Sequence, residues 1–153
     1  MTHSKEYYER IIKEAQAGIA ALEDKSWPKY GDQYFYTASI GVILEECWSH
    51  SPYDLDRKVL GSIFKSVQDA AEYVKWRKLH TALMKASDGW SSDGVNYSPS
   101  YVNNKISTTD WSWTRSTIPY FKTHSRAIAI STSILGSDAE FYFTYDQFKG
   151  QRL

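Results

Sequence analysis

Few residues of this chain have the type and spacing that catalysis needs. Cys47 is the only cysteine, and His50 is the closest histidine along the chain. A thiolate nucleophile needs a base within hydrogen-bond reach, but positions three apart on an extended strand face opposite sides. A single cysteine also excludes an internal disulfide and a cysteine-based zinc site within this chain. We therefore expect Cys47 to be a buried structural residue.

Histidines and carboxylates give no stronger signal. The four histidines show no metal-ligand spacing such as His-x-x-x-His: His3, His50, His80 and His124. The acidic pairs Glu45–Glu46 and Asp54 with Asp56 are expected on solvated surface, and the adjacent Glu45 and Glu46 point to opposite sides of a strand. The sequence also has no Gly-rich phosphate loop. It predicts a protein that is not an enzyme, with no catalytic residue, metal or cofactor.

A local basic cluster suggests a different kind of chemistry. Positive side chains gather in the C-terminal half of a predicted helix: Lys75, Arg77, Lys78, His80 and Lys85. Cations at that end offset the helix dipole, but they also suit contact with phosphates. The four lysines and arginines are therefore candidates for nucleic-acid binding, beside a purely structural role.

Three tryptophans are candidates for binding a partner: Trp90, Trp111 and Trp113. If Asn103–Asn104 is a two-residue hairpin turn, Trp111 and Trp113 share a polar face of the hairpin. Exposed there, they suit a protein interface or base stacking, unless a helix or another unit covers them. Trp90 lies in a stretch rich in Ser, Asp and Gly, where it either pins that stretch onto the core or contacts a partner.

The elements that position these residues begin with an amphipathic helix at residues 4–25. Its apolar side chains follow spacings of four and three: Tyr8, Ile12, Ala15, Ile19 and Leu22. The stripe either packs on the rest of the chain or forms a dimer seam made by Tyr8, Ile12, Ile19 and Leu22. Pro28 ends the helix, because proline disfavours the helical conformation of the preceding Trp27.

Residues 27–87 predict a β-β-β-α unit. Aromatic and β-branched residues on both sides of a glycine turn favour a hairpin, and Ser66 is a helix N-cap with Asp69 three residues on. The expected elements are strands at 33–37 and 42–48, a polar loop at 49–56, a strand at 60–65 and a helix from Ser66 to about Ala86.

Residues 96–153 repeat this plan in shorter form after a linker at 88–95. The expected elements are strands at 97–102 and 105–113, a strand at 118–121, a helix from Thr123 to Gly136, and a helical turn or strand from Ser137 through 141–143. Phe64-Lys65-Ser66 and Phe121-Lys122-Thr123 align at an offset of 57 residues. An internal duplication explains this economically. The fold class is therefore α+β: a helix over residues 1–26, then two related units with antiparallel sheets, together one compact domain.

Length and composition limit the function classes. The chain has 153 residues, about one domain, with 18 Lys plus Arg against 18 Asp plus Glu. Charge balance provides no overall field toward nucleic acid or anionic membrane. No apolar run is long enough for a membrane helix, and the N-terminus lacks the apolar core of a signal peptide, so we expect a cytoplasmic protein.

The motifs of the chain resemble a loosely defined family of small phage and prophage proteins of unknown function. The matching residues are Trp27-Pro28, Gly31-Asp32-Gln33-Tyr34-Phe35-Tyr36, Gly41, Trp48, Gly61-Ser62-Ile63-Phe64-Lys65-Ser66, Ala70-Ala71, Tyr97 and Tyr120-Phe121-Lys122-Thr123. Ser62 stands where the family usually has Asn, and Ser98-Pro99-Ser100 replaces a more hydrophobic strand. The family brings no catalytic or ligand residues.

The resemblance implies a phage protein in a bacterial host cell, and such proteins often inhibit host systems stoichiometrically, CRISPR and other defence complexes among them. We expect a non-enzymatic accessory protein that binds a host protein or protein–nucleic-acid complex, with an anti-CRISPR-like inhibitor as the specific form. The alternative is a single-stranded nucleic-acid-binding protein that uses an aromatic sheet face.

Overall fold

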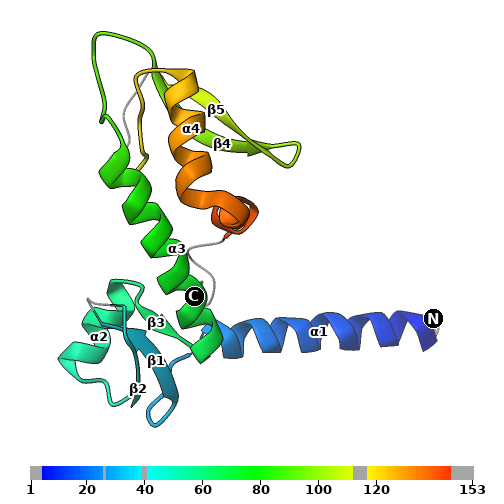
Figure 1. The fold of residues 1–153 in the computed structure, drawn as a ribbon. Helices are drawn as coiled ribbons and strands as arrows, with labels where there is room; N and C mark the ends of the chain where they lie inside the picture. Colours follow the sequence, from blue (N-terminus) through cyan, green and yellow to red (C-terminus); the bar gives the residue numbers. More distant parts are fainter. Residues whose placement is uncertain (1–4, 26, 39–40, 112–116, 146–153) are drawn as a thin grey trace. The chain divides into compact units, whose positions relative to one another are not determined.

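The computed structural model describes residues 5–25, 27–38, 41–111 and 117–145 (Figure 1). The chain divides into two compact units. Among the described residues, unit 1 extends to Ala70 and unit 2 begins at Ala71. Both are built from helices and antiparallel strands. The predicted α+β class is therefore confirmed.

Unit 1 is a three-stranded antiparallel sheet with helices before and between its strands. Its elements are α1 (Lys5–Lys25), β1 (Gln33–Thr37), β2 (Ile43–Cys47), α2 (Pro52–Val59), β3 (Ile63–Phe64) and the start of α3 (Val67–Ala86). The strand order is β2-β1-β3, which makes β1 the central strand. Tyr34, Trp48 and Ile63 form the buried core, with Trp27 and Tyr36 packed against it.

The predicted polar loop at 49–56 is wrong, because α2 begins inside it. Ser51 is the N-cap: its hydroxyl accepts from the Asp54 amide, and the Asp54 carboxylate accepts from the Ser51 amide. Pro52 fits the first helical turn, where its missing N–H has no partner to lose. Since α2 runs to Val59, the strand expected at 60–65 shrinks to Ile63–Phe64.

Asp54 is fully buried, so the prediction that it lies on solvated surface is also wrong. Its carboxylate accepts hydrogen bonds from the Tyr34 hydroxyl at 2.6 Å, from both the amide and the hydroxyl of Ser49, and from the Ser51 amide. Arg57 donates to the same Tyr34 hydroxyl at 2.6 Å, and its guanidinium lies 3.7 Å from the centre of the Tyr36 ring. These bonds tie α2 to β1.

Cys47 and the apolar stripe of α1 are the remaining features of unit 1 that the sequence singled out. Cys47 is exposed, not buried as predicted, because it ends the edge strand β2, whose last four residues are all exposed. On α1, Tyr8 and Ile12 are about half exposed, whereas the side chains of Ile19 and Leu22 lie outside what the structure describes. The dimer seam stays a prediction.

Unit 2 consists of most of α3, a β-hairpin and a C-terminal helical segment. The elements after α3 are β4 (Asn96–Val102), β5 (Lys105–Trp111), α4 (His124–Leu135), the 3-10 turn η1 (Gly136–Asp138) and α5 (Ala139–Thr144). Val102 pairs with Lys105 around Asn103 and Asn104, whose φ values of 51° and 60° confirm the predicted hairpin turn. The segment at 141–143 is helical.

The strand predicted at 118–121 is reduced to one bridge between Tyr97 and Phe121. These two residues exchange both backbone hydrogen bonds, so the backbone groups of alternate β4 residues face the segment that contains Phe121. Continuing the ladder would place Pro99 opposite Pro119, and neither residue has an N–H to donate. The strand therefore stops after a single pair.

The two units share a strand topology. In each, the first strand is central, the second pairs with it as a hairpin, and a short third segment lies on its other side before a capped helix. Ser66 and Thr123 cap α3 and α4 as predicted: their hydroxyls accept from Asp69 and Arg126 amides at 3.1 and 3.2 Å. This topology agrees with an internal duplication.

The division between the units falls after Ala70, inside α3, whereas the sequence suggested a linker at 88–95. Most of α3 belongs to unit 2, because Leu83 is buried with Leu135 and Tyr142. Residues 88–95 are held by the same unit. Asp88 accepts from the Lys122 amide and the Arg126 guanidinium, and the Asn96 side chain bonds the backbone at Ser91 and Gly94.

Candidate functional site

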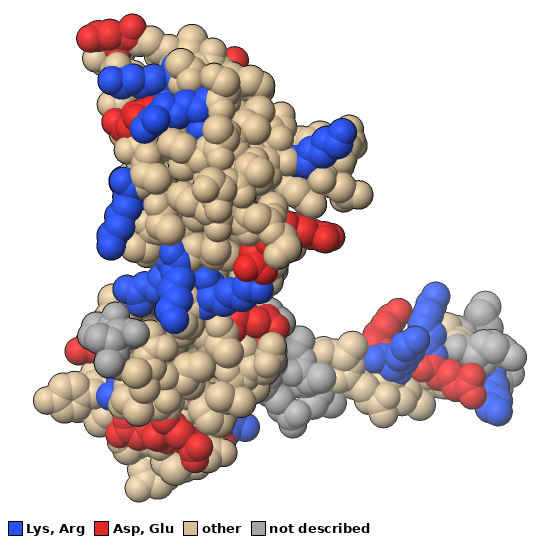
Figure 2. Space-filling model, in the orientation of Figure 1, with Lys and Arg blue, Asp and Glu red and all other residues tan. Residues whose placement is uncertain are grey.

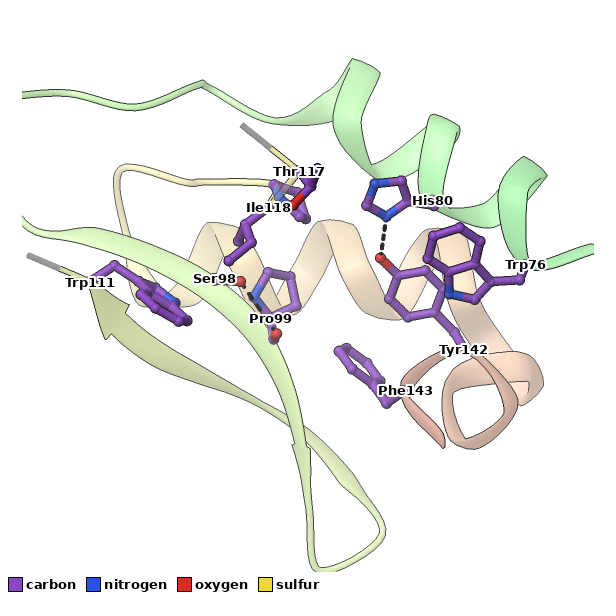
Figure 3. Close-up of a pocket in the computed structure, with 10 residues that line it drawn as sticks. Trp76, His80, Ser98, Pro99, Trp111, Thr117, Ile118, Tyr142 and Phe143 are labelled. Carbon is purple, nitrogen blue, oxygen red and sulfur yellow. Dashed lines mark hydrogen bonds between the residues drawn. The ribbon is translucent and has the colours of Figure 1, made fainter. Parts of the chain in front are cut away.

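Unit 2 contains a pocket of about 350 Å³ (Figure 3). Residues from α3, the hairpin, the segment before α4, and α5 line it: Trp76, His80, Ser98, Pro99, Trp111, Thr117, Ile118, Pro119, Tyr142 and Phe143. All ten lie within unit 2. A volume of this size is at the small end of ligand pockets, which run from about 300 to 1,000 Å³.

One wall is a group of nearly parallel rings from α3 and α5. Trp76 and His80 are one helical turn apart, and their rings stack at 4.9 Å with an interplanar angle of 9°. Tyr142 lies at 10° to Trp76 and 16° to His80, with centroids 6.2 and 6.1 Å away. Packing with buried Leu83 and Leu135 fixes the two helices that supply these rings.

His80 and Tyr142 form the polar part of this wall. The Nδ1 atom of His80 and the Tyr142 hydroxyl are hydrogen-bonded at 2.8 Å, as Figure 3 shows. Burial lowers the pKa of His80 below its ordinary value of 6.5, and burial raises the pKa of Tyr142 to about 12. Both groups are therefore neutral at pH 7.

The opposite wall starts where the third strand of unit 2 fails to form. Pro99 and Pro119, the two residues that end the ladder, both line the pocket, with Ile118 and the exposed Thr117 beside them. The hydroxyl-bearing Ser98 is buried on β4. The interruption of the sheet thus leaves a hollow with two rigid prolines in its wall.

None of the ten lining residues carries a charge at neutral pH. Lys75, next to Trp76 in sequence, is paired with Asp138 at 2.6 Å and lies 4.5 Å from the centre of the Phe141 ring. Figure 2 shows a largely uncharged centre on this face of unit 2, with Lys, Arg, Asp and Glu side chains around its margins. The pocket suits a neutral group.

The predicted nucleic-acid residues are on α3, but the structure does not hold them together as one free cluster. Arg77, Lys78 and Lys85 are exposed, whereas Lys75 is engaged by Asp138. His80, which the sequence placed with them, is half-buried and faces Tyr142.

The three predicted partner-binding tryptophans meet different environments. Trp111 lines the pocket and shares a hairpin face with Ser98 and Ser100, as the register predicted. Trp90 packs edge-to-face on buried Tyr120 at 5.2 Å, so it pins residues 88–95 to unit 2. Trp113 lies outside the described residues.

Sequence reasoning missed most of the pocket. Trp76 and His80 were four residues apart on a predicted helix, which places them on one face, but His80 was assigned to the basic cluster. Tyr142 and Phe143 had no periodic signal over so short a segment. Pairing them with α3 depends on contacts between residues more than sixty positions apart.

Across the described parts of the chain, no group of three or more His, Cys, Asp and Glu is placed to hold a metal ion. In those same ranges, no helix combines the length and apolar character needed to cross a membrane.

Comparison of the chain with protein-family models, curated proteins and solved structures gave no match. The resemblance to phage and prophage proteins therefore stays a prediction from the motifs.

Proposed function

We propose that this is a non-enzymatic binding protein that takes a protein partner through the pocket of unit 2. The observation behind the proposal is the uncharged aromatic lining, with Trp76, Trp111 and Tyr142 at one hollow. Trp and Tyr dominate the energetics of protein interfaces, especially where they line a pocket that receives an anchor residue. A neutral pocket also matches the charge balance of the whole chain.

The test is capture of a partner by the full chain and by two single variants. Thr117→Trp places a large ring at an exposed position of the pocket lining, and Thr132→Trp places the same ring at an exposed position of α4 outside that lining. A partner identified with the wild-type chain, in the presence of nuclease, is then titrated against each variant. We expect Thr117→Trp to weaken binding at least about tenfold and Thr132→Trp to leave it unchanged. Equal affinities would rule the pocket out.

A second function has a specific observation in its favour. Arg77, Lys78 and Lys85 are exposed on α3, the helix that also supplies Trp76 to the pocket. A base stacked on Trp76 would place its phosphate nearest to Arg77, the next residue, since Lys78 and Lys85 lie about half a turn away around α3. Titration with a fluorescent single-stranded oligonucleotide at two salt concentrations separates the two functions, because phosphate contacts weaken steeply with salt.

Inhibition of a bacterial defence complex is a more specific version of the first proposal, and we call it the finer form. It rests on the motif resemblance, and the pocket supports only the coarser statement that a partner is bound. Co-purification of a defence complex with the wild-type chain, and its loss with Thr117→Trp, would support the finer form.

A further inference from the structure

We propose that the pocket receives the ring of a tyrosine or tryptophan from the partner, and that the His80–Tyr142 pair accepts the hydrogen bond which that ring donates. This inference rests on the proposed function, because it names the group that the same pocket holds. Three properties of the pocket lead to it: its charge, its shape and its hydrogen-bonding capacity.

The described lining of the pocket favours a neutral group. A carboxylate, ammonium or phosphate would lose its water without gaining an opposite charge from any of the ten lining residues, which is costly. Lys75, which neighbours Trp76, already donates to Asp138. The volume of about 350 Å³ suits one side chain better than an extended segment.

The shape of the pocket selects a flat group. The rings of Trp76, His80 and Tyr142 are within 16° of parallel, with Trp76 stacked on His80, so one more flat ring can lie parallel to this group. Pro99 and Ile118 supply apolar surface on the other side (Figure 3). An aromatic ring can contact both walls at once, and stacked or edge-on ring contacts add to the gain from burial.

The hydrogen-bonding groups of the pocket favour a ring that carries a polar group. If His80 donates from Nδ1 to the Tyr142 hydroxyl, its Nε2 atom is left as an acceptor. If Tyr142 donates to Nδ1 instead, its own oxygen keeps a lone pair. In both arrangements the pair offers one acceptor and one remaining donor. A phenol can use both, an indole N–H can use the acceptor, and a phenylalanine ring can use neither.

The test measures binding of small probes to the full chain by NMR. The probes are the N-acetyl amides of tyrosine, tryptophan and phenylalanine, and adenosine monophosphate as the nucleotide probe. We expect the tyrosine and tryptophan amides to shift the His80 ring signals and to bind about fivefold tighter than the phenylalanine amide. Equal binding of all three amides, tightest binding of the nucleotide, or no shift at millimolar concentrations would overturn the inference.

Matched variants assign the preference to the polar pair. His80→Phe keeps a ring beside Trp76 but removes both nitrogens, so it should abolish the preference for the tyrosine amide over the phenylalanine amide. His124→Phe is the control, since His124 is exposed and bonds Thr108 outside the pocket lining. If His80→Phe perturbs the fold, His80→Leu provides the second measurement, because it also removes both ring nitrogens and should likewise abolish the preference.

The outcomes separate this inference from the proposed function. If Thr117→Trp blocks the partner but the amides show no preference, the pocket binds a partner through another kind of group. If Thr117→Trp does not block the partner, the proposed function fails whatever the amides do.

Discussion

At the scale of single residues, Asp54 shows how a charged side chain becomes part of a core. Its carboxylate is fully buried and accepts four hydrogen bonds, from Tyr34, from two groups of Ser49 and from Ser51. A buried charge is tolerated when its hydrogen-bonding capacity is satisfied, and removing it leaves its donors without a partner. Asp54 therefore stabilises the junction of α2 and β1.

Replacing Asp54 should destabilise unit 1. Asp54→Ala leaves the hydroxyl of Tyr34 and the amides of Ser49 and Ser51 without their acceptor, so we expect a loss of about 3 kcal/mol in the free energy of unfolding. Urea denaturation followed by circular dichroism measures it. Asp56→Ala is the control, because Asp56 lies on the same helix but is exposed. Equal effects of the two substitutions would contradict the assignment.

The same carboxylate makes stability depend on pH. Burial alone raises the pKa of Asp54, but the hydrogen bonds from Tyr34, Ser49 and Ser51 outweigh it and hold the pKa below the ordinary value of 3.8. The unfolded chain then binds a proton more readily than the folded one, so this stabilisation is present above about pH 4 and is lost as the pH falls further. Denaturation midpoints between pH 6 and pH 3 should fall less steeply for Asp54→Asn than for the wild type.

At the scale of elements, both units place a capped helix directly after a short third strand segment. Ser66 follows β3, and Thr123 follows the bridge at Phe121. The hydroxyl of each accepts an amide of the first helical turn, which would otherwise lack a partner. In both units, therefore, the same kind of side-chain cap begins a helix directly after a short strand segment.

Removing either cap should lower the free energy of unfolding by a similar amount. Ser66→Ala and Thr123→Ala should each lower the free energy of unfolding by about 1 kcal/mol, whereas Ser66→Thr and Thr123→Ser should be nearly neutral. Chemical denaturation compares them. Ser137→Ala serves as the reference, since Ser137 is exposed and provides no side-chain cap for η1 or α5. A loss at Ser137 as large as at the caps would argue against the capping role.

At the scale of the whole molecule, each unit has its own buried cluster. Tyr34, Trp48 and Ile63 belong to unit 1, and Leu83, Leu135 and Tyr142 to unit 2. Cooperative opening follows such clusters, because residues that share a core lose their contacts together. The division inside α3 makes that helix the element common to both units.

Hydrogen exchange should resolve the two units. In Asp54→Ala, amides of β1 and β2 should exchange faster, while those of β4 and β5 keep their protection. Leu135→Ala, which opens a cavity in the other cluster, should give the reverse pattern. Equal loss of protection in both sheets for both variants would show a single cooperative unit instead.

Interactions between residues close in sequence made much of the fold predictable. The pocket was less predictable, because it depends on residues far apart in sequence. The Asn103–Asn104 turn and the caps at Ser66 and Thr123 depend on residues only a few positions apart, and sequence reasoning found them. It missed α2 because Pro52 was interpreted as a loop residue. The His80–Tyr142 contact joins residues 62 positions apart, which no local pattern encodes.

Pro99 and Pro119 have a consequence for the thermodynamics of binding. A proline ring fixes φ, so this part of the pocket has few backbone conformations to lose when a ligand arrives. The entropic cost of ordering that wall has been met during folding, and more of the contact energy remains available as affinity. Pro119→Ala frees φ at one of the two positions, while Pro99 still lacks the N–H needed to complete the pair. It should therefore make association entropically less favourable, which calorimetry with the bound partner would detect.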